Sequence, residues 1–125
     1  MDAAIANAKM ALTLTAKRMA SLTDAADGLD PLALDNPADD RIITTRRAIC
    51  RVALVAAETA GRFEREKLRR DPMSWMLARR ALFDGEVALD ACLHRTACLR
   101  AIFIHGLGLD PDIDPAELVA LIGEI

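Results

Sequence analysis

Residues 41–70 carry the pattern that most constrains how this chain can fold. At 100° per residue, the larger apolar side chains fall in one sector of a helix: Ile42, Ile49, Val52, Ala56 and Phe63. On the opposite side lies a narrow arginine stripe, joined only by Glu58: Arg47, Arg51, Arg62, Arg65 and Arg69. Opposed faces with a period of 3.6 residues are typical of an amphipathic α-helix. The sequence therefore predicts one long helix over residues 41–70, continuous through Gly61.

The composition favours an all-α fold. Of the 125 residues, 53% are hydrophobic, but only 3% are aromatic and none is tyrosine. Small and aliphatic side chains suit closely packed helices better than sheets. No alternating strand pattern bounded by turns is present. A chain of this length is expected to form a single domain, residues 1–125.

Two segments place apolar or small residues at alternating spacings of four and three, which is the spacing of a heptad seam. The first seam is Met1, Ile5, Ala8, Leu12, Thr15, Met19 and Leu22. The second is Ile42, Thr45, Ile49, Val52, Ala56, Thr59 and Phe63. The sequence therefore predicts a long helical hairpin of residues 1–23 and 41–70. Two such hairpins are predicted to pair as a homodimeric four-helix bundle.

The remaining segments are predicted from their turn residues. Residues 24–40 hold six Asp, two Pro and one Gly, which indicates an Asp-rich loop whose Asp39 and Asp40 cap the following helix. A compact C-terminal unit follows over residues 71–125, with three helices at about 72–84, 86–105 and 115–123. Asp-Pro pairs at 71–72 and 114–115 are typical helix starts, and glycines at 85 and 106 separate the elements.

Charge is distributed unevenly along the chain. Residues 41–70 contain nine Lys or Arg and three Glu, a net charge of +6, whereas the whole chain carries −3. The other residues therefore carry −9. A simple nucleic-acid-binding protein is usually basic overall. A basic helix in an acidic chain indicates either a localised anion-binding face or neutralisation by the chain's own aspartates, among them Asp110, Asp112 and Asp114.

The arginine stripe is the candidate binding surface. Like charges at Arg47/Arg51 and Arg65/Arg69 cost on the order of a few tenths of a kcal/mol each on an isolated helix, so an anionic partner is expected. The apolar Leu54 and Val55 interrupt the stripe, which favours a protein contact over a phosphate backbone. The predicted partner-binding residues are Arg47, Arg51, Leu54, Val55, Arg62, Arg65 and Arg69, joined by Trp75. Alternatively, Trp75 anchors its own short helix on the helical bundle instead of contacting a partner.

Three functions follow from these patterns. The first is a non-enzymatic regulatory or adaptor protein that binds another protein through the arginine-lined helix, whose charges would suit an acidic partner. The second is a dimeric DNA-binding regulator that places the arginine stripe on phosphates. The third is a metal-binding or enzymatic protein that uses His94 and Cys98, which stand four residues apart, a spacing that suits two ligands of one metal ion.

Cysteine use and hydropathy suggest the compartment. Cys50, Cys92 and Cys98 are an odd number without a C-x-x-C pair, which predicts free thiols in a reducing cytoplasm. No apolar run approaches the roughly 20 residues that a membrane-spanning helix needs, so no membrane partner is expected. No phosphate-cradling loop or nucleophile motif is present, and therefore no cofactor is predicted.

Overall fold

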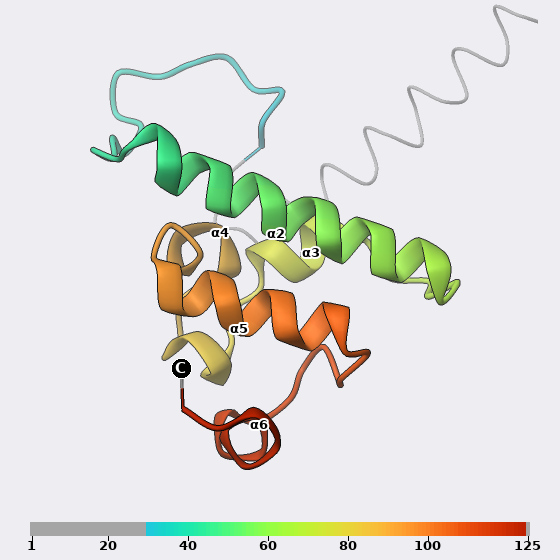
Figure 1. The fold of residues 1–125 in the computed structure, drawn as a ribbon. Coiled ribbons are helices and arrows are strands. Elements are labelled where there is room, and N and C mark those ends of the chain that lie inside the picture. Colours follow the sequence, from blue (N-terminus) through green and yellow to red (C-terminus); the bar gives the residue numbers. More distant parts are fainter. Residues whose placement is uncertain (1–29, 125) are drawn as a thin grey trace, which may run out of the picture. The chain divides into compact units, whose positions relative to one another are not determined.

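The computed structural model of this chain describes residues 30–124 (Figure 1). The chain divides after Asp39, so residues 30–39 and residues 40–124 are described separately. The helix predicted over residues 1–23, its heptad seam and the first part of the Asp-rich loop lie outside the described residues. The hairpin and the dimeric bundle therefore stay predictions.

Residues 40–124 are helical, which confirms the predicted fold class. The helices are α2 (Arg46–Arg65), α3 (Pro72–Leu77), α4 (Ala88–Ala91), α5 (Arg95–Gly106) and α6 (Pro115–Ile122), with one 3-10 turn, η1 (Ala81–Phe83). No strand occurs in residues 40–124; Arg79 and Val87 form only an isolated bridge. Within the described part of the chain, none of these helices is long and apolar enough to cross a membrane.

Residues 30–39 form a loop, as predicted, and side chains stabilise two turns within it. The carboxylate of Asp30 accepts a hydrogen bond from the backbone N–H of Leu32 at 2.9 Å. The carboxylate of Asp39 accepts from the backbone N–H of Asn36 at 2.9 Å. The prediction that Asp39 and Asp40 cap the next helix is wrong, because that helix begins several residues later.

Helix α2 is shorter than predicted at its start. Thr45 is the N-cap, and its side-chain oxygen accepts a hydrogen bond from the N–H of Ala48 at 3.1 Å. Residues 42–44 are β-branched, which lowers helix propensity, and they have no regular secondary structure before this cap. From Arg46 the helix runs through Gly61 without a turn, as predicted.

Helix α2 also ends earlier than predicted, at Arg65. Lys67 adopts a left-handed backbone conformation with a φ of 53°. The N–H of Leu68 then donates to the carbonyl of Phe63 at 2.9 Å, a bond that reaches back five residues. This arrangement closes a helix in the Schellman manner, usually with glycine at the left-handed position.

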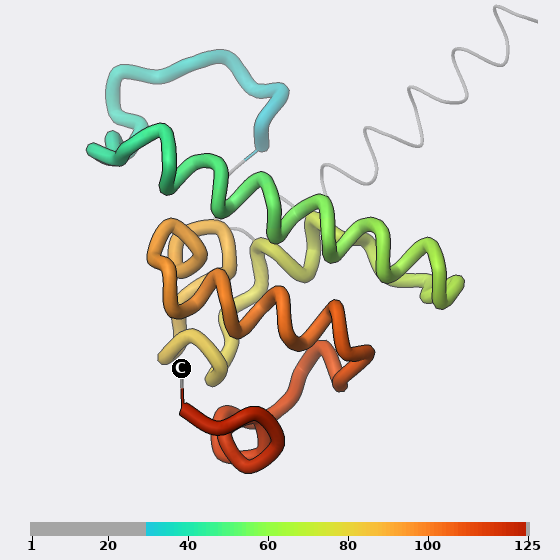
Figure 2. The backbone as a smooth tube through the Cα atoms, viewed as in Figure 1, coloured from blue at the N-terminus to red at the C-terminus, as the bar shows by residue number. Residues whose placement is uncertain are grey.

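Helices α2 and α5 lie side by side and run in the same direction (Figure 2). Two hydrogen bonds from α2, one to the residue just before the cap of α5 and one to α5 itself, have the same sequence offset of 42 residues: from Arg51 to the Leu93 carbonyl, and from Arg62 to the Ile104 carbonyl. A constant offset is what parallel helices require. The core lies among α2, α3, η1, α4, α5 and α6, and its largest buried members include Trp75, Met76, Ile104, Leu118 and Val55.

The second predicted heptad seam is used within residues 40–124. Thr59 and Phe63 are buried, and Val52 and Ala56 are partly buried against the core. Ile42 and Ile49, at the other end of the seam, are exposed. The C-terminal half of this seam therefore packs on the chain's own C-terminal helices.

Two predicted C-terminal helices are each divided, and the third is confirmed. Asp71 caps α3 as predicted, but this helix ends at Leu77, after which the chain turns through η1. The helix predicted over 86–105 breaks at residues 92–94, where the Leu93 carbonyl accepts from Arg51 instead of continuing a helical ladder. Helix α6 begins after its cap, Asp114, and ends before Gly123, close to the predicted range.

The left-handed residue at the end of α2 gives a first prediction. Replacing Lys67→Gly should raise the free energy of unfolding by about 1 kcal/mol, because glycine adopts this conformation without the steric cost of a Cβ atom. Chemical denaturation measures the change. Lys67→Ala is the control: it removes the same charge and keeps the Cβ, so it should give no such gain. Equal stabilities of the two variants would contradict the prediction.

Candidate functional site

The exposed part of the predicted binding surface lies along one edge of α2. Arg47, Leu54 and Arg65 fall within about 20° of one another when projected down the helix. All three are exposed, and 47% of Leu54 is open to solvent. Arg69 is also exposed, but it follows the end of the helix. We call Arg47, Leu54 and Arg65 the arginine edge.

Other predicted surface residues lie inside the protein. Val55 is fully buried in the core, Arg62 is 4% exposed, and Trp75 is 1% exposed. Arg51 is half-buried, with its guanidinium donating to the Leu93 carbonyl at 3.4 Å. The sequence predicted that all of these residues face outward, and the structure corrects this: the side of α2 that carries Arg51, Val55 and Arg62 faces the core. The inner face of α2 includes two of the five stripe arginines, because guanidinium groups can be buried where carbonyl acceptors meet them.

Arg62 is the arginine that this rotation places in the interior. Its Nε donates to a carboxylate oxygen of Glu66, one turn along α2, at 3.0 Å. Its Nη1 donates to the Ile104 carbonyl of α5 at 3.3 Å and lies 3.4 Å from Nδ1 of His105. The guanidinium therefore joins α2 to the last turn of α5.

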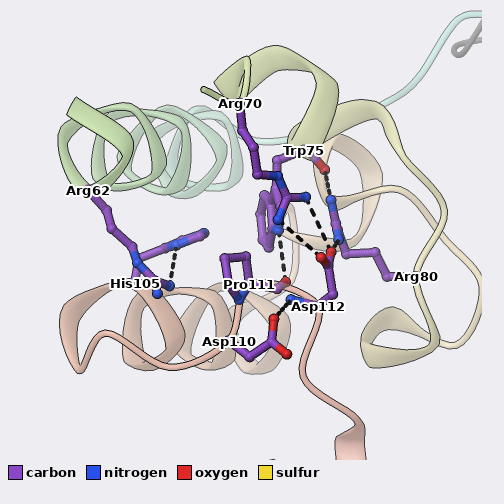
Figure 3. Close-up of polar contacts among 8 residues, drawn as sticks. All are labelled: Arg62, Arg70, Trp75, Arg80, His105, Asp110, Pro111 and Asp112. Atoms are coloured by element: carbon purple, nitrogen blue, oxygen red, sulfur yellow. Dashed lines mark hydrogen bonds and ion pairs between the residues drawn. The ribbon is translucent and has the colours of Figure 1, made fainter. Parts of the chain in front are cut away.

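His105 is a buried histidine whose ring lies against Arg62 (Figure 3). A guanidinium has only donors, so Nδ1 of His105 accepts from Arg62 and the ring proton lies on Nε2. The ring packs edge-on against Trp75 at 4.5 Å and against Phe63 at 5.9 Å between centroids. Burial, followed by the nearby charge of Arg62, lowers the pKa of His105 from 6.5 to about 4.

A second buried arginine, Arg80, stacks on Trp75 from the other side. Its guanidinium carbon lies 4.3 Å from the indole ring, and Nη2 donates to the Trp75 carbonyl at 2.8 Å. Its Nη1 donates to Asp112, which also accepts two bonds from Arg70, at 3.0 and 3.3 Å (Figure 3). Burial opposes ionisation of Asp112, but the bonds from Arg70 and Arg80 outweigh it and lower its pKa.

Sequence reasoning found one part of this network. The expectation that basic residues of 41–70 pair with the aspartates near residue 112 holds for Arg70, which binds Asp112. Arg80 and the interior role of His105 were missed. Their partners come from segments about 30 to 40 residues away, so no local periodicity could signal them.

His94 and Cys98 point to different surroundings. His94 is exposed and lines a cleft of about 270 Å³ between η1 and α5, together with Thr96 and Arg100. Cys98 is buried, and its Sγ lies 3.8 Å from the Arg51 carbonyl on α2. Burial raises the pKa of the Cys98 thiol, which disfavours the thiolate that a metal needs. Within residues 30–124, no group of three His, Cys, Asp or Glu side chains is placed to share a metal ion.

Comparisons with protein-family models, with curated proteins and with solved structures gave no match for this chain. Its function is therefore inferred from the geometry of its own residues. Among the described residues, that geometry offers a buried polar network around Trp75, in which Arg80 Nε and His105 Nε2 have no hydrogen-bond partner, and an open edge on α2.

The neutral His105 gives a prediction for pH dependence. Unfolded chains take up a proton at this ring near pH 6.5, whereas the folded protein resists protonation down to about pH 4. Stability should therefore fall as the pH drops through this interval, by about 3 kcal/mol in total at about 1.4 kcal/mol per pH unit. Urea denaturation at several pH values between 7 and 4 measures this loss.

A matched pair of variants isolates the contribution of His105 from that of the carboxylates. His105→Gln should flatten the pH profile over this interval, whatever it does to stability at pH 7. His94→Gln changes an exposed histidine and should leave the profile as it is. If both variants kept the wild-type slope, His105 would not be the group responsible.

The buried Arg80 gives a prediction for Asp112. Asp112→Asn removes the negative charge opposite a guanidinium whose side chain is only 8% exposed. Removing one partner of a buried ion pair is costly, and here the cost should be about 2 kcal/mol because Asp112 itself is partly open to solvent. Thermal and chemical denaturation measure it. Asp90→Asn, at an exposed position, should cost little; equal losses would contradict the prediction.

Proposed function

We propose that this chain is a small, non-enzymatic helical protein that acts as a regulator or adaptor by binding an acidic protein through the arginine edge of α2. The observation that carries this proposal is the exposed Leu54, which lies between Arg47 and Arg65 on one edge. An apolar anchor flanked by cations suits a partner surface that has one apolar side chain and carboxylates on both sides of it.

The spacing along the helix defines what the partner must present. Leu54 lies about 10 Å from Arg47 and about 16 Å from Arg65 along the axis, at a rise of about 1.5 Å per residue. A partner with acidic groups about 27 Å apart would therefore engage both arginines at once. A helix or an extended segment of the partner that lies along α2 could place its acidic groups at this separation.

The charges of the arginine edge are available for a partner. Within residues 30–124, Arg47, Arg65 and Arg69 make no ion pair or hydrogen bond through their side chains, in contrast to Arg62 and Arg70. Their exposure means that binding through them should weaken with salt, as expected for electrostatically steered association. Leu54 should provide the part of the affinity that salt does not remove.

A DNA-binding regulator is the second candidate. The observation in its favour is the group of exposed cations at the end of α2, formed by Arg65, Lys67 and Arg69. A phosphate backbone offers no apolar surface for the exposed Leu54 to contact, and the chain as a whole is acidic. For these reasons the protein partner is preferred.

We further propose that the protein works as a homodimer and that residues 1–23 form a helix within that dimer. Support comes from the heptad spacing of Met1 to Leu22 in the sequence. A dimer would present two arginine edges, and a partner with two acidic segments would then bind more tightly than a partner with one.

Photo-crosslinking tests the protein partner. A photo-reactive phenylalanine analogue in place of Leu54, expressed in the native cells, should give one defined protein adduct. The same analogue in place of Leu121, which is exposed on α6, is the matched control and should not give that adduct. Combining it with Arg47→Glu and Arg65→Glu should lower the yield by about tenfold, because both flanking charges are reversed.

Fluorescence anisotropy with a labelled random-sequence DNA duplex distinguishes the DNA-binding candidate from the protein-binding one. Under the proposed function, the wild-type protein binds this duplex no better than the Arg47→Glu, Arg65→Glu variant does. Micromolar binding that collapses with added salt and is lost in the variant would instead favour DNA. An adduct of the Leu54 probe with nucleic acid would contradict the protein partner directly.

A further inference from the structure

The face of α2 that points away from the core carries a second seam, distinct from the arginine edge. Its residues follow one another at spacings of four, three, four, three and four: Arg46, Cys50, Ala53, Ala57, Ala60 and Glu64. All six are exposed. We call this set the outer seam. Its central residues are small and apolar, its first residue is positively charged and its last residue is negatively charged.

The outer seam is complementary to itself only when two copies run in opposite directions. If the crossing point is at residue 55, Arg46 of one copy faces Glu64 of the other. Cys50 then faces Ala60, and Ala53 faces Ala57, so every position of the seam meets another position of the seam. Two copies running in the same direction would instead set Arg46 against Arg46 and Glu64 against Glu64, which costs free energy.

The two charged ends are available for such pairing. Within residues 30–124, neither Arg46 nor Glu64 has a side-chain hydrogen bond or ion pair. The alanines between them let two helix backbones approach closely, and Ile49, which is 55% exposed, flanks the seam and would be covered. Alternating spacings of four and three are those of a coiled-coil interface, in which antiparallel helices place such positions in shared layers.

We propose that a second copy of this chain packs antiparallel on the outer seam of α2, with Arg46 of each copy paired to Glu64 of the other. The inference rests on the proposed homodimer and names its interface; it does not depend on the acidic partner. The arginine edge lies about a quarter turn around the helix from the middle of the outer seam, so it stays at the rim of the dimer, open to another protein.

Charge reversal tests the pairing in the full-length chain. Arg46→Glu places two carboxylates opposite each other at both ends of the interface, and Glu64→Arg places two guanidinium groups there. Each variant alone should dimerise at least about tenfold more weakly than the wild type in sedimentation equilibrium. An equimolar mixture of the two variants should recover the dimer, because both end pairs are then complementary. Circular dichroism should show the wild-type fold for each variant.

Cysteine cross-linking tests the direction and the register. The wild-type chain has Cys50 in the seam, and antiparallel packing separates the two copies of Cys50 by about 15 Å along the axis. Ala60→Cys introduces a thiol that faces Cys50 of the second copy at both ends. Oxidised glutathione, which takes up the two electrons and two protons released by each thiol pair, should then link Ala60→Cys into a covalent dimer. The wild type should stay unlinked.

A variant with Cys50→Ser and Ala60→Cys is the matched control, because its thiols are also about 15 Å apart and should stay unlinked. Cross-linking of the wild type through Cys50 would mean that the copies run in the same direction, and it would overturn the proposal. If Arg46→Glu did not weaken the dimer, the proposal that the outer seam forms the interface would be overturned, but the proposed homodimer would stand. A wild-type chain that is monomeric would overturn both, and the face would then belong to another segment of the chain or to another protein.

Discussion

The buried indole of Trp75 is the contact on which the described helices depend. It donates through Nε1 to the Pro111 carbonyl at 2.9 Å, carries the Arg80 guanidinium on its face and meets the His105 ring edge-on. These contacts connect α3, the end of α5 and the segment that leads to α6. With few aromatic residues in the chain, one large side chain supplies contact area that many alanines cannot.

Two buried cations make the interior a network of directional hydrogen bonds rather than a purely apolar core. Arg62 and Arg80 are buried, and each finds a backbone carbonyl and a carboxylate. A buried guanidinium that lost either acceptor would be left with an unsatisfied donor, which costs more than the bond itself contributes. The network therefore fixes one relative placement of α2, α3 and α5, and that placement decides which side of α2 remains open.

The sequence predicts helix type and approximate position better than helix ends and orientation. Opposed apolar and charged faces with the helical period predicted α2, and the Asp-Pro pairs predicted the starts of α3 and α6. The break at residues 92–94 depends on a contact made after folding, so no local signal marks it, and Lys67 occupies a left-handed position that glycine usually marks. The arginine stripe was divided for the same reason: Arg62 has acceptors on α5 that only the folded chain provides, whereas Arg47 and Arg65 have none among residues 30–124.

The three thiols of the chain differ in a way that makes folding directly observable. Cys50 is exposed on α2, whereas Cys92 and Cys98 are buried beneath it, and burial raises the pKa of Cys92 to about 12. In a single copy of the chain, a thiol-specific alkylating reagent will therefore modify Cys50 first, and it will reach the other two only when α2 lifts from α4 and α5. The rate at which the second and third labels appear measures how often this opening occurs in the native protein, without denaturant and without introducing a further residue.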